Sequence, residues 1–311
     1  MKYDLLTAGM ALIDSIIKGF HPEPVSASGY TAESASLNVG GEAVNGAVTA
    51  AKLGLKTGIL CALGSDAAGG MIRNALRESG VDTELIASSP ATPVTTLFVN
   101  GDGTRRSITN EAHRIHFHPE RYSEHFMETR ALSLGSLFRA PFDDAEILRN
   151  TVRPAAEAGV IVFADTKLPN FRKIGLSDFR DTLPLLDYIT PNEDEARYFT
   201  GQTVPEGMAD VFLNFGVKNV IIKLGSRGCL LKNQEVCIRL PGYRVDAVDS
   251  TGAGDNFLAG FISEILRGKG QADALRFANA CGAVCTTATG ATTAIESREQ
   301  VLQWMTEHEY E

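Results

Sequence analysis

Several features that mark large protein classes are missing from this chain. Its five cysteines are odd in number and form no CxxC pair, so neither a disulfide framework nor a zinc ribbon is expected, and a reducing cytoplasm fits best. The 29 Lys and Arg are outnumbered by 38 Asp and Glu, and the net charge of −9 gives no broad positive field for nucleic acid or an anionic membrane. The uncharged run over residues 277–295 is rich in Ala, Thr, Gly and Cys, which disfavours a membrane span. Asp4 and Asp14 around the first apolar stretch make a poor signal peptide.

The common phosphate-binding motifs are missing as well. The Gly268-Lys269 pair is not preceded by the spacing of a Walker A loop. No GxGxxG follows a predicted strand, and no HRD and DFG pair occurs. Any phosphate site therefore uses other glycine clusters.

The chain has the composition of a globular protein. It has 311 residues, of which 44% are hydrophobic and 22% charged, and this excludes disorder, collagen and coiled coil. Apolar runs alternate with helical patterns such as residues 43–53 and 71–79. The predicted strands are 4–10, 56–63, 131–134, 160–164, 187–189 and 219–224. This alternation predicts one α/β domain over residues 1–311, built on a mostly parallel sheet.

Two segments interrupt the alternation. Residues 94–100 and 104–109 are rich in strand-forming residues and flank Gly101-Asp102-Gly103, which predicts a hairpin. Residues 13–39 contain no clear helix. We expect segments 13–39 and 94–109 to build a small β-layer that serves as a lid or an oligomer surface, with ordinary surface insertions as the alternative. At the other end, Ser297 followed by Gln300 predicts the start of a last helix.

The strongest chemical signal is the segment Asp249–Asp255. It follows a strand-like run at 243–248 and precedes a helical run at 256–266. The backbone N–H groups of Gly252, Ala253 and Gly254 would form an anion hole at a helix N-terminus. Asp255 beside it could accept a proton from a hydroxyl that attacks phosphorus. The alternative is that Thr251, Gly252 and Asp255 only cap the helix.

A second signal precedes the Ala-rich helix at 43–53. Gly40-Gly41 would let a ligand approach the backbone closely, and Asn45 offers a donor and an acceptor to a sugar hydroxyl. The alternative is a plain glycine turn at a helix start.

Together these segments resemble the PfkB carbohydrate kinases, the ribokinase-like family. Asp249–Asp255 resembles the DTxGAGD signature, and Gly40-Gly41 with Asn45 resembles the N-terminal glycine motif. Residues 190–195 resemble the PNExE motif, 223–228 the xLGxxG segment, and 277–280 the helix beside the adenine. The matches run in the family's order from residue 5 to about 290. The resemblance implies a ribokinase-like fold with a small β-sheet lid, which in this family often also forms dimers.

The resemblance implies roles for individual residues. Asp255 would be the general base, above the anion hole of residues 252–254. Residues near the nucleotide would be Asn192, Lys223, Gly225, Thr251 and Asn279, with Glu195 reaching Mg²⁺ through water. Residues that hold sugar hydroxyls would be Asp14, Gly41 and Asn45. Some members bind K⁺, and its ligands here would be Asp249, the Thr251 carbonyl and carbonyls from 285–290.

Other polar residues stay open to two interpretations. Asp165-Thr166-Lys167 departs from the Asp-Pro-Asn found in some members, and Lys167 would either reach a phosphate or be a solvated loop residue. Arg106, with its neighbour Arg105, would either read a substrate anion or protect a solvated edge strand. His113 is a candidate substrate contact. A metal site of His113, His116 and His118 is the weaker alternative, because no fourth ligand joins them in sequence.

These observations favour an ATP- and Mg²⁺-dependent kinase of a free sugar, fructose-like or ribose-like. A nucleoside kinase would use Phe98 and Tyr30 to hold a base, and a sugar-phosphate kinase would use Arg105 and Arg106. The vitamin kinases of this fold usually lack the Gly-Gly…Asn motif. A non-catalytic sugar- or nucleotide-binding regulator would leave Asp255 unexplained, and a purely structural protein would leave both glycine motifs unexplained. The expected partners are the sugar and a second copy through the lid.

Overall fold

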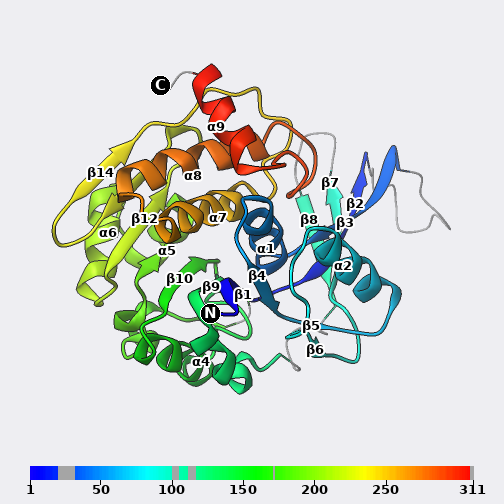
Figure 1. Cartoon of the computed structure of the whole chain (residues 1–311), viewed down its shortest axis with the longest axis horizontal. Helices are drawn as coiled ribbons and strands as arrows, with labels where there is room; N and C mark the ends of the chain where they lie inside the picture. The colour runs from blue at the N-terminus through cyan, green and yellow to red at the C-terminus, as the bar shows by residue number, and fades with distance from the viewer. Residues whose placement is uncertain (20–31, 100–104, 111–116, 171, 309–311) are drawn as a thin grey trace.

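The main sheet of the protein is mostly parallel. The computed structural model describes residues 1–19, 32–99, 105–110, 117–170 and 172–308. The eight strands are β1 (Tyr3–Ala8), β4 (Thr57–Leu60), β9 (Thr129–Leu137), β10 (Ile161–Thr166), β11 (Tyr188–Ile189), β12 (Asn219–Lys223), β13 (Cys229–Lys232) and β14 (Cys237–Leu240). Their order is β14-β13-β12-β11-β10-β9-β1-β4, and only the pairs that involve β13 are antiparallel (Figure 1). The predicted sheet type is confirmed.

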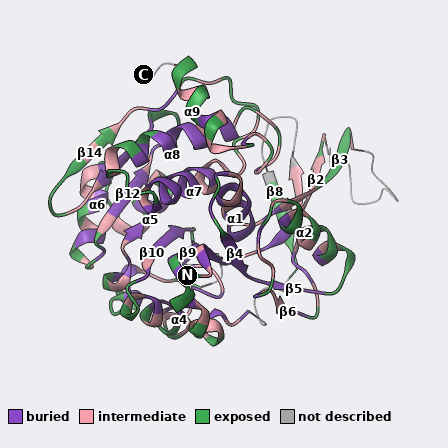
Figure 2. Cartoon of the chain, viewed as in Figure 1, coloured by how far each residue is buried: buried purple, intermediate pink, exposed green. Residues whose placement is uncertain are grey.

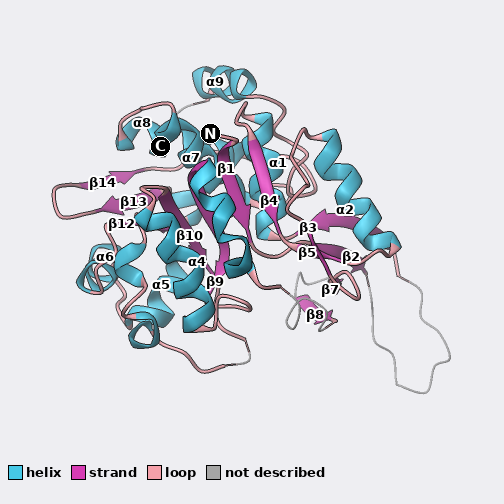
Figure 3. Ribbon diagram, turned by 60° about the horizontal axis from the view of Figure 1, so that its bottom comes forward, coloured by secondary structure: helices cyan, strands magenta, loops and turns pink. Residues whose placement is uncertain are grey.

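Helices cover both faces of this sheet (Figure 3). The helices that cover it are α1 (Glu42–Lys52), α4 (Ala145–Glu157), α5 (Glu193–Thr200), α6 (Pro205–Asn214), α7 (Ala253–Leu266) and α8 (Gln271–Cys285). Helix α2 (Ala67–Glu78) contacts α1 and the small sheet, and α9 (Arg298–Glu307) packs on α8. Successive side chains of a strand point to opposite faces. On β1, Leu5 therefore lies in the core layer under α7 and α8, and Leu6 lies in the layer under α4 and α6. Because both faces are buried, the central strands read as continuous apolar runs (Figure 2).

A second, four-stranded sheet lies beside the main body (Figure 1). It consists of β2 (Leu12–Lys18), β3 (Ser34–Gly40), β7 (Val94–Val99) and β8 (Arg105–Thr109), in the order β3-β2-β7-β8. The strands come from the two segments that the sequence sets apart, and β7 and β8 pair antiparallel as the hairpin prediction requires. The predicted turn itself, residues 101–103, lies outside the described residues.

Two strand predictions need correction. Residues 243–248 form no strand: Tyr243 makes an isolated bridge, and the N–H groups of Val248 and Asp249 bond the Thr286 carbonyl in the turn after α8. Tyr243 is buried and packs edge-on against Trp304, whereas Ala247 and Val248 are exposed, so the segment is not a buried strand. The predicted strand 56–63 divides at Cys61, because its last residues leave the main sheet as β5 (Ala62–Leu63) and pair with β6 (Ala87–Ser88).

The last helix begins where the sequence predicts. The Ser297 hydroxyl accepts a hydrogen bond from the N–H of Gln300 at 3.1 Å. The Gln300 side chain accepts from the N–H of Glu296 rather than from Ser297, so only half of a capping box forms. No helix in the described part of the chain is long and apolar enough to cross a bilayer.

Candidate active site

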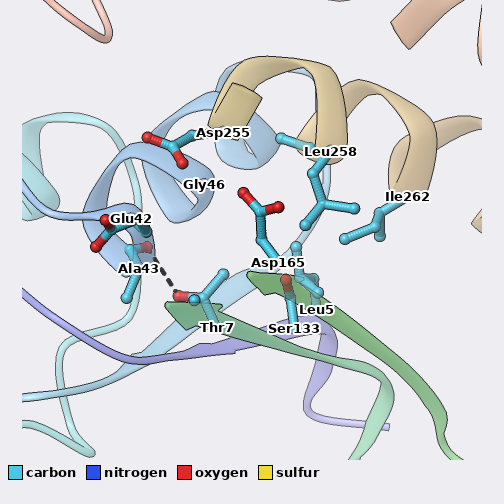
Figure 4. A pocket seen from close by; sticks show the side chains of 12 residues that line it. Leu5, Thr7, Glu42, Ala43, Gly46, Ser133, Asp165, Asp255, Leu258 and Ile262 are labelled. Carbon is cyan, nitrogen blue, oxygen red and sulfur yellow. Dashed lines mark hydrogen bonds between the residues drawn. The ribbon is translucent and has the colours of Figure 1, made fainter. Parts of the chain in front are cut away.

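The predicted site residues gather at the carboxyl ends of the parallel strands, where open α/β sheets bind ligands. Asp165 lies near the end of β10, and the N-termini of α1 and α7 meet above it. Figure 4 shows the carboxylates of Glu42, Asp165 and Asp255 around one small cavity, contributed by three different elements. The cavity measures about 20 Å³, which is room for about one water molecule.

The N-terminal glycine pair shapes the start of α1. Gly41 is the N-cap residue with a φ of +99°, and a Cβ there would collide with the Met10 carbonyl, so a side chain is excluded. A Cβ on Gly40 would lie 2.6 Å from Oδ2 of Asp14, so the Asp14 carboxylate packs directly on this turn. The pair therefore brings Asp14 on β2 close to the first turn of α1.

The signature segment shapes the start of α7. Its N-cap residue, Gly252, has a φ of +78° and supplies no side chain to the first N–H groups. Asn256 donates to the carbonyls of Gly252 at 2.8 Å and Ala291 at 2.7 Å, which fixes the turn from behind. The backbone arrangement suits an anion at the helix N-terminus. The alternative was that Thr251, Gly252 and Asp255 only cap the helix. In the described residues, the N-cap of α7 makes no side-chain hydrogen bond that would support this alternative.

The two glycine motifs meet through α1 and α7. Nδ2 of Asn45 donates to Oδ2 of Asp255 at 2.7 Å, although the residues are 210 positions apart. One helical turn further along, the Thr49 hydroxyl donates to Oδ1 of Asn256 at 2.8 Å. These bonds place the predicted sugar-binding amide against the predicted base.

The carboxylate of Asp255 is tuned by its neighbours. Burial raises the pKa of Asp255 to about 7, and the negative charges of Glu42 and Asp165 add to the rise, against Lys167 and Asn45. Burial, followed by Glu42, raises the pKa of Asp14 to about 6. A carboxylate with a pKa near 7 is a suitable general base at neutral pH.

Glu42 and Asp165 are site residues to which the sequence analysis assigned no role. Oε1 of Glu42 lies 3.2 Å from Nζ of Lys167, so the lysine reaches this carboxylate cluster with a side chain that is 39% exposed. Asp165 accepts hydrogen bonds from Nζ of Lys223 at 2.6 Å and the Thr190 hydroxyl at 2.9 Å. The available signals were the position of Glu42 directly after the glycine pair and that of Asp165 at a strand end.

Lys223 borders the predicted anion hole. A Cβ on Gly254 would lie 3.1 Å from Nζ of Lys223, so the glycine leaves the ammonium group room beside the start of α7. Lys223 also lines a larger cleft of about 400 Å³ next to the turn. Gly225 and Asn279 line the same cleft together with Phe257, so the cleft brings together three of the predicted nucleotide residues, Lys223, Gly225 and Asn279.

Asn192 and Glu195 cap α5 reciprocally. The Glu195 N–H donates to Oδ1 of Asn192 at 2.9 Å, and the Asn192 N–H donates to Oε2 of Glu195 at 3.0 Å. The Thr166 hydroxyl also donates to Oε2 of Glu195. Burial and the charge of Asp165 raise the pKa of Glu195. The described residues contain no group of three or more His, Cys, Asp or Glu that could hold a metal ion without other ligands.

Asp249 ties the signature segment to the turn after α8. Its Oδ1 accepts from the backbone N–H and the hydroxyl of Thr251, and its Oδ2 accepts from the Gly290 N–H at 3.1 Å. The predicted K⁺ site at Asp249 and Thr251 remains a prediction.

The remaining candidates lie on or beside the small sheet. Arg106 is exposed on β8, opposite Phe98 and two strands away from Asp14. His118 contacts Oε1 of Glu120 at 3.1 Å. Tyr30, His113, His116 and the side chain of Arg105 lie outside the described part of the structure.

Comparison with known proteins identifies the family of the chain. The family model described as pfkB family carbohydrate kinase matches residues 9–298. The chain is similar to a ribokinase of Haemophilus influenzae, with 30% identity over 284 residues that cover 88% of this chain and 90% of that protein. It is also similar to an ATP-dependent ribose-1-phosphate kinase of Halopiger xanaduensis, with 32% identity over 257 residues and 82% of each chain covered. Among solved structures, Arabidopsis thaliana ribokinase complexed with ribose and ATP matches with a TM-score of 0.85 and 27% identity, covering 97% of this chain and 98% of that one.

Proposed function

The chain belongs to the pfkB family of carbohydrate kinases, and from this premise we propose that it transfers the γ-phosphate of ATP to a sugar hydroxyl, with Asp255 as the general base. As a member of this family it is a phosphotransferase with an alcohol group as acceptor. One observation carries the assignment of the base. The 2.7 Å bond between Asn45 and Asp255 joins the sugar-side and phosphate-side motifs at the N-terminus of α7.

In the proposed step, the acceptor oxygen attacks the γ-phosphorus while the bond from that phosphorus to the bridging oxygen of ADP breaks. The hydroxyl proton passes to the carboxylate of Asp255, whose pKa of about 7 suits this transfer. The backbone N–H groups at Gly252–Gly254 stabilise the charge on the transferred group, and they need no reorganisation because the turn is already fixed. Lys223, beside Gly254, adds a positive charge at the same place.

We place the nucleotide in the cleft of about 400 Å³ that Gly225 and Asn279 line, with its phosphates toward Lys223 and Thr251. The relative solved with ribose and ATP supports this choice of nucleotide. Mg²⁺ is held mainly by phosphate oxygens and water, so one nearby carboxylate is enough, and Glu195, fixed by its cap, fits that part together with Asn192. The metal would neutralise charge that develops on the phosphates. A K⁺ ion held by Asp249 and the Thr251 carbonyl is proposed from the resemblance to family members that bind K⁺.

We place the sugar against Asp14, Gly41 and Asn45, beneath the small sheet, which would act as a lid that excludes water. His113 and Arg106 are proposed as further contacts from that side. The edge strands β3 and β8 expose Leu37 and Ile108, which supports pairing of two copies through this sheet. The five unpaired cysteines support a cytoplasmic location.

The test is an ADP-release assay with MgATP and K⁺ over a panel of sugars, sugar acids, sugar phosphates and nucleosides. Turnover of one acceptor should fall at least about 100-fold in Asp255→Asn, the lower end for loss of a general base. Asp273→Asn, an exposed carboxylate on α8, is the matched control and should keep wild-type turnover. Near-normal turnover by a folded Asp255→Asn variant would refute the role of Asp255. ATP binding without turnover of any acceptor would favour a regulator.

A further inference from the structure

Glu42 enters the proposed phosphoryl transfer only through the pKa of Asp255, yet it lies between Gly41 and Asn45 on the acceptor side. It is the first residue of α1, and its carboxylate pairs with Nζ of Lys167 at 3.2 Å. The side chain of Glu42 is 16% exposed and that of Lys167 is 39% exposed, so the carboxylate is the more buried partner and the lysine remains accessible. Burial alone would raise the pKa of Glu42, but the charge of Lys167 and hydrogen bonds to the carboxylate together outweigh burial, and the pKa is lowered. Glu42 is therefore a permanent negative charge in the neutral pH range.

The charges around this position are mostly negative. Asp14, Glu42 and Asp255 contribute three carboxylates, and Lys167 contributes the cation that offsets them. The interaction with Glu42 raises the pKa of Lys167, which keeps the amine charged. The other nearby cation, Lys223, is already bonded to Asp165 on the nucleotide side. Lys167 is thus the cation best placed to bind an anionic acceptor, and its ion pair with Glu42 competes with that binding.

A second observation concerns the hydrogen-bonding groups of the same site. Asn45 is 5% exposed, and its Nδ2 is used by Asp255. Its Oδ1 is buried and has no hydrogen-bond partner among the described residues. A buried acceptor atom without a donor is costly, and a ligand hydroxyl would satisfy it. Together with the carboxylates, Asn45 makes the site rich in acceptors, which complements a ligand rich in O–H donors.

We propose that Glu42 determines acceptor specificity: by pairing with Lys167 it selects an uncharged polyhydroxy sugar and rejects acceptors that carry a phosphate or carboxylate group. The inference rests on the proposed function and narrows its substrate class. It also predicts a substrate that differs in charge from that of the similar ribose-1-phosphate kinase, whose named substrate is an anion. Removing the charge of Glu42 would free Lys167 to bind an anion, since an ammonium group forms charge-assisted hydrogen bonds with phosphate and carboxylate.

The experiment compares kcat/KM for matched acceptors: ribose with ribose 1-phosphate, and fructose with fructose 6-phosphate. The wild-type enzyme should prefer the neutral sugar of at least one pair by at least about tenfold, because a site of net negative charge repels an anion. Glu42→Gln should reduce this preference at least about tenfold, mainly through a lower KM for the phosphorylated sugar. Measurement at pH 8.5 keeps Asp255 ionised in both enzymes, so a change in its pKa does not enter the comparison.

Two further variants make the result specific to the pair. In a Lys167→Met background, Glu42→Gln should change the preference much less, because no amine is left to release. This double variant also covers a failure of Glu42→Gln to fold with an unpaired lysine. Glu146→Gln, an exposed carboxylate in the first turn of α4 on the other side of the sheet, should leave the preference unchanged.

The outcomes separate the two proposals. A wild-type enzyme that prefers the phosphorylated sugars, or a folded Glu42→Gln variant with an unchanged preference, overturns the role of Glu42 and leaves the kinase assignment intact. A wild-type enzyme that binds MgATP but phosphorylates no acceptor overturns both. Thermal stabilisation of the wild-type enzyme by ribose but not by ribose 1-phosphate, with stabilisation of Glu42→Gln by both compounds, would support the charge argument through binding alone.

Discussion

The titration of Asp255 is the residue-scale property that most directly links this structure to a measurement. Its carboxylate must be ionised to accept a proton, and burial together with Glu42 and Asp165 holds its pKa at about 7. We therefore expect kcat/KM for the acceptor to rise with pH across 7 and to level off above about 8, one unit beyond the midpoint. Protonation of Asp14, with a pKa of about 6, would steepen the loss on the acidic side.

The shift of that profile identifies the group that titrates. Glu42→Gln removes a negative neighbour of Asp255, so the midpoint should move to lower pH. Rates measured from pH 5.5 to 9 with saturating MgATP provide the test. A profile that stays flat over this range would exclude a base with a raised pKa.

Motifs point to single candidate residues when the chemistry is local to the motif. Asp255, Asn45 and the glycines of both turns could be named from the sequence because each lies in a short, recognisable segment. Glu42 could not, since its effect depends on Lys167 and Asp255, which come from other elements. The Asp165–Lys223 pair was missed for the same reason.

At the scale of elements, the turn before α7 is the part most dependent on one residue type. Gly252 has a φ of +78°, and a Cβ there would lie 2.5 Å from Cβ of Ala291. Gly252→Ala should therefore destabilise the protein by about 1–3 kcal/mol and lower kcat, because the N–H groups of the turn would be displaced. Urea unfolding and the ADP-release assay measure the two effects.

Gly70→Ala is the matched control for this change. Gly70 lies inside α2, and a Cβ there would meet nothing within 4 Å, so the substitution should be neutral or stabilising by up to about 1 kcal/mol. If Gly252→Ala behaved like Gly70→Ala in both measurements, the turn would not need its left-handed glycine.

A helix or strand could be predicted where its sequence pattern also indicates what packs against it. The central strands are continuous apolar runs because helices cover both faces of the sheet. Such a run predicts a buried strand whatever its position in the strand order. Residues 243–248 instead alternate apolar and charged residues, and only Tyr243 of the segment is buried, against Trp304. An alternating pattern fits a strand but does not supply a neighbouring strand to pair with, so this strand prediction was wrong.

At the scale of the whole molecule, the site forms only because two segments that lie far apart in the sequence pack together. Asn45 and Asp255 are 210 positions apart, and Nζ of Lys52 donates to the Thr292 carbonyl across 240 positions. Helices α1 and α7 lie side by side over the sheet (Figure 1), and Lys52 at the end of α1 extends the contact to the segment after α8. The sequence predicts both motifs, but their contact is a property of the fold.

The Thr49–Asn256 bond lies within the contact between α1 and α7 and tests it. Thr49→Val keeps the shape of the side chain but leaves Oδ1 of Asn256 buried without its donor, which should cost about 1–3 kcal/mol of unfolding free energy. Asn256 also holds the carbonyls of Gly252 and Ala291, so kcat should fall although Thr49 touches no substrate. Thr49→Ser retains the hydroxyl and should keep most of both quantities. A Thr49→Val enzyme with wild-type kcat and reduced stability would mean that the helix contact supports the fold without positioning the anion hole.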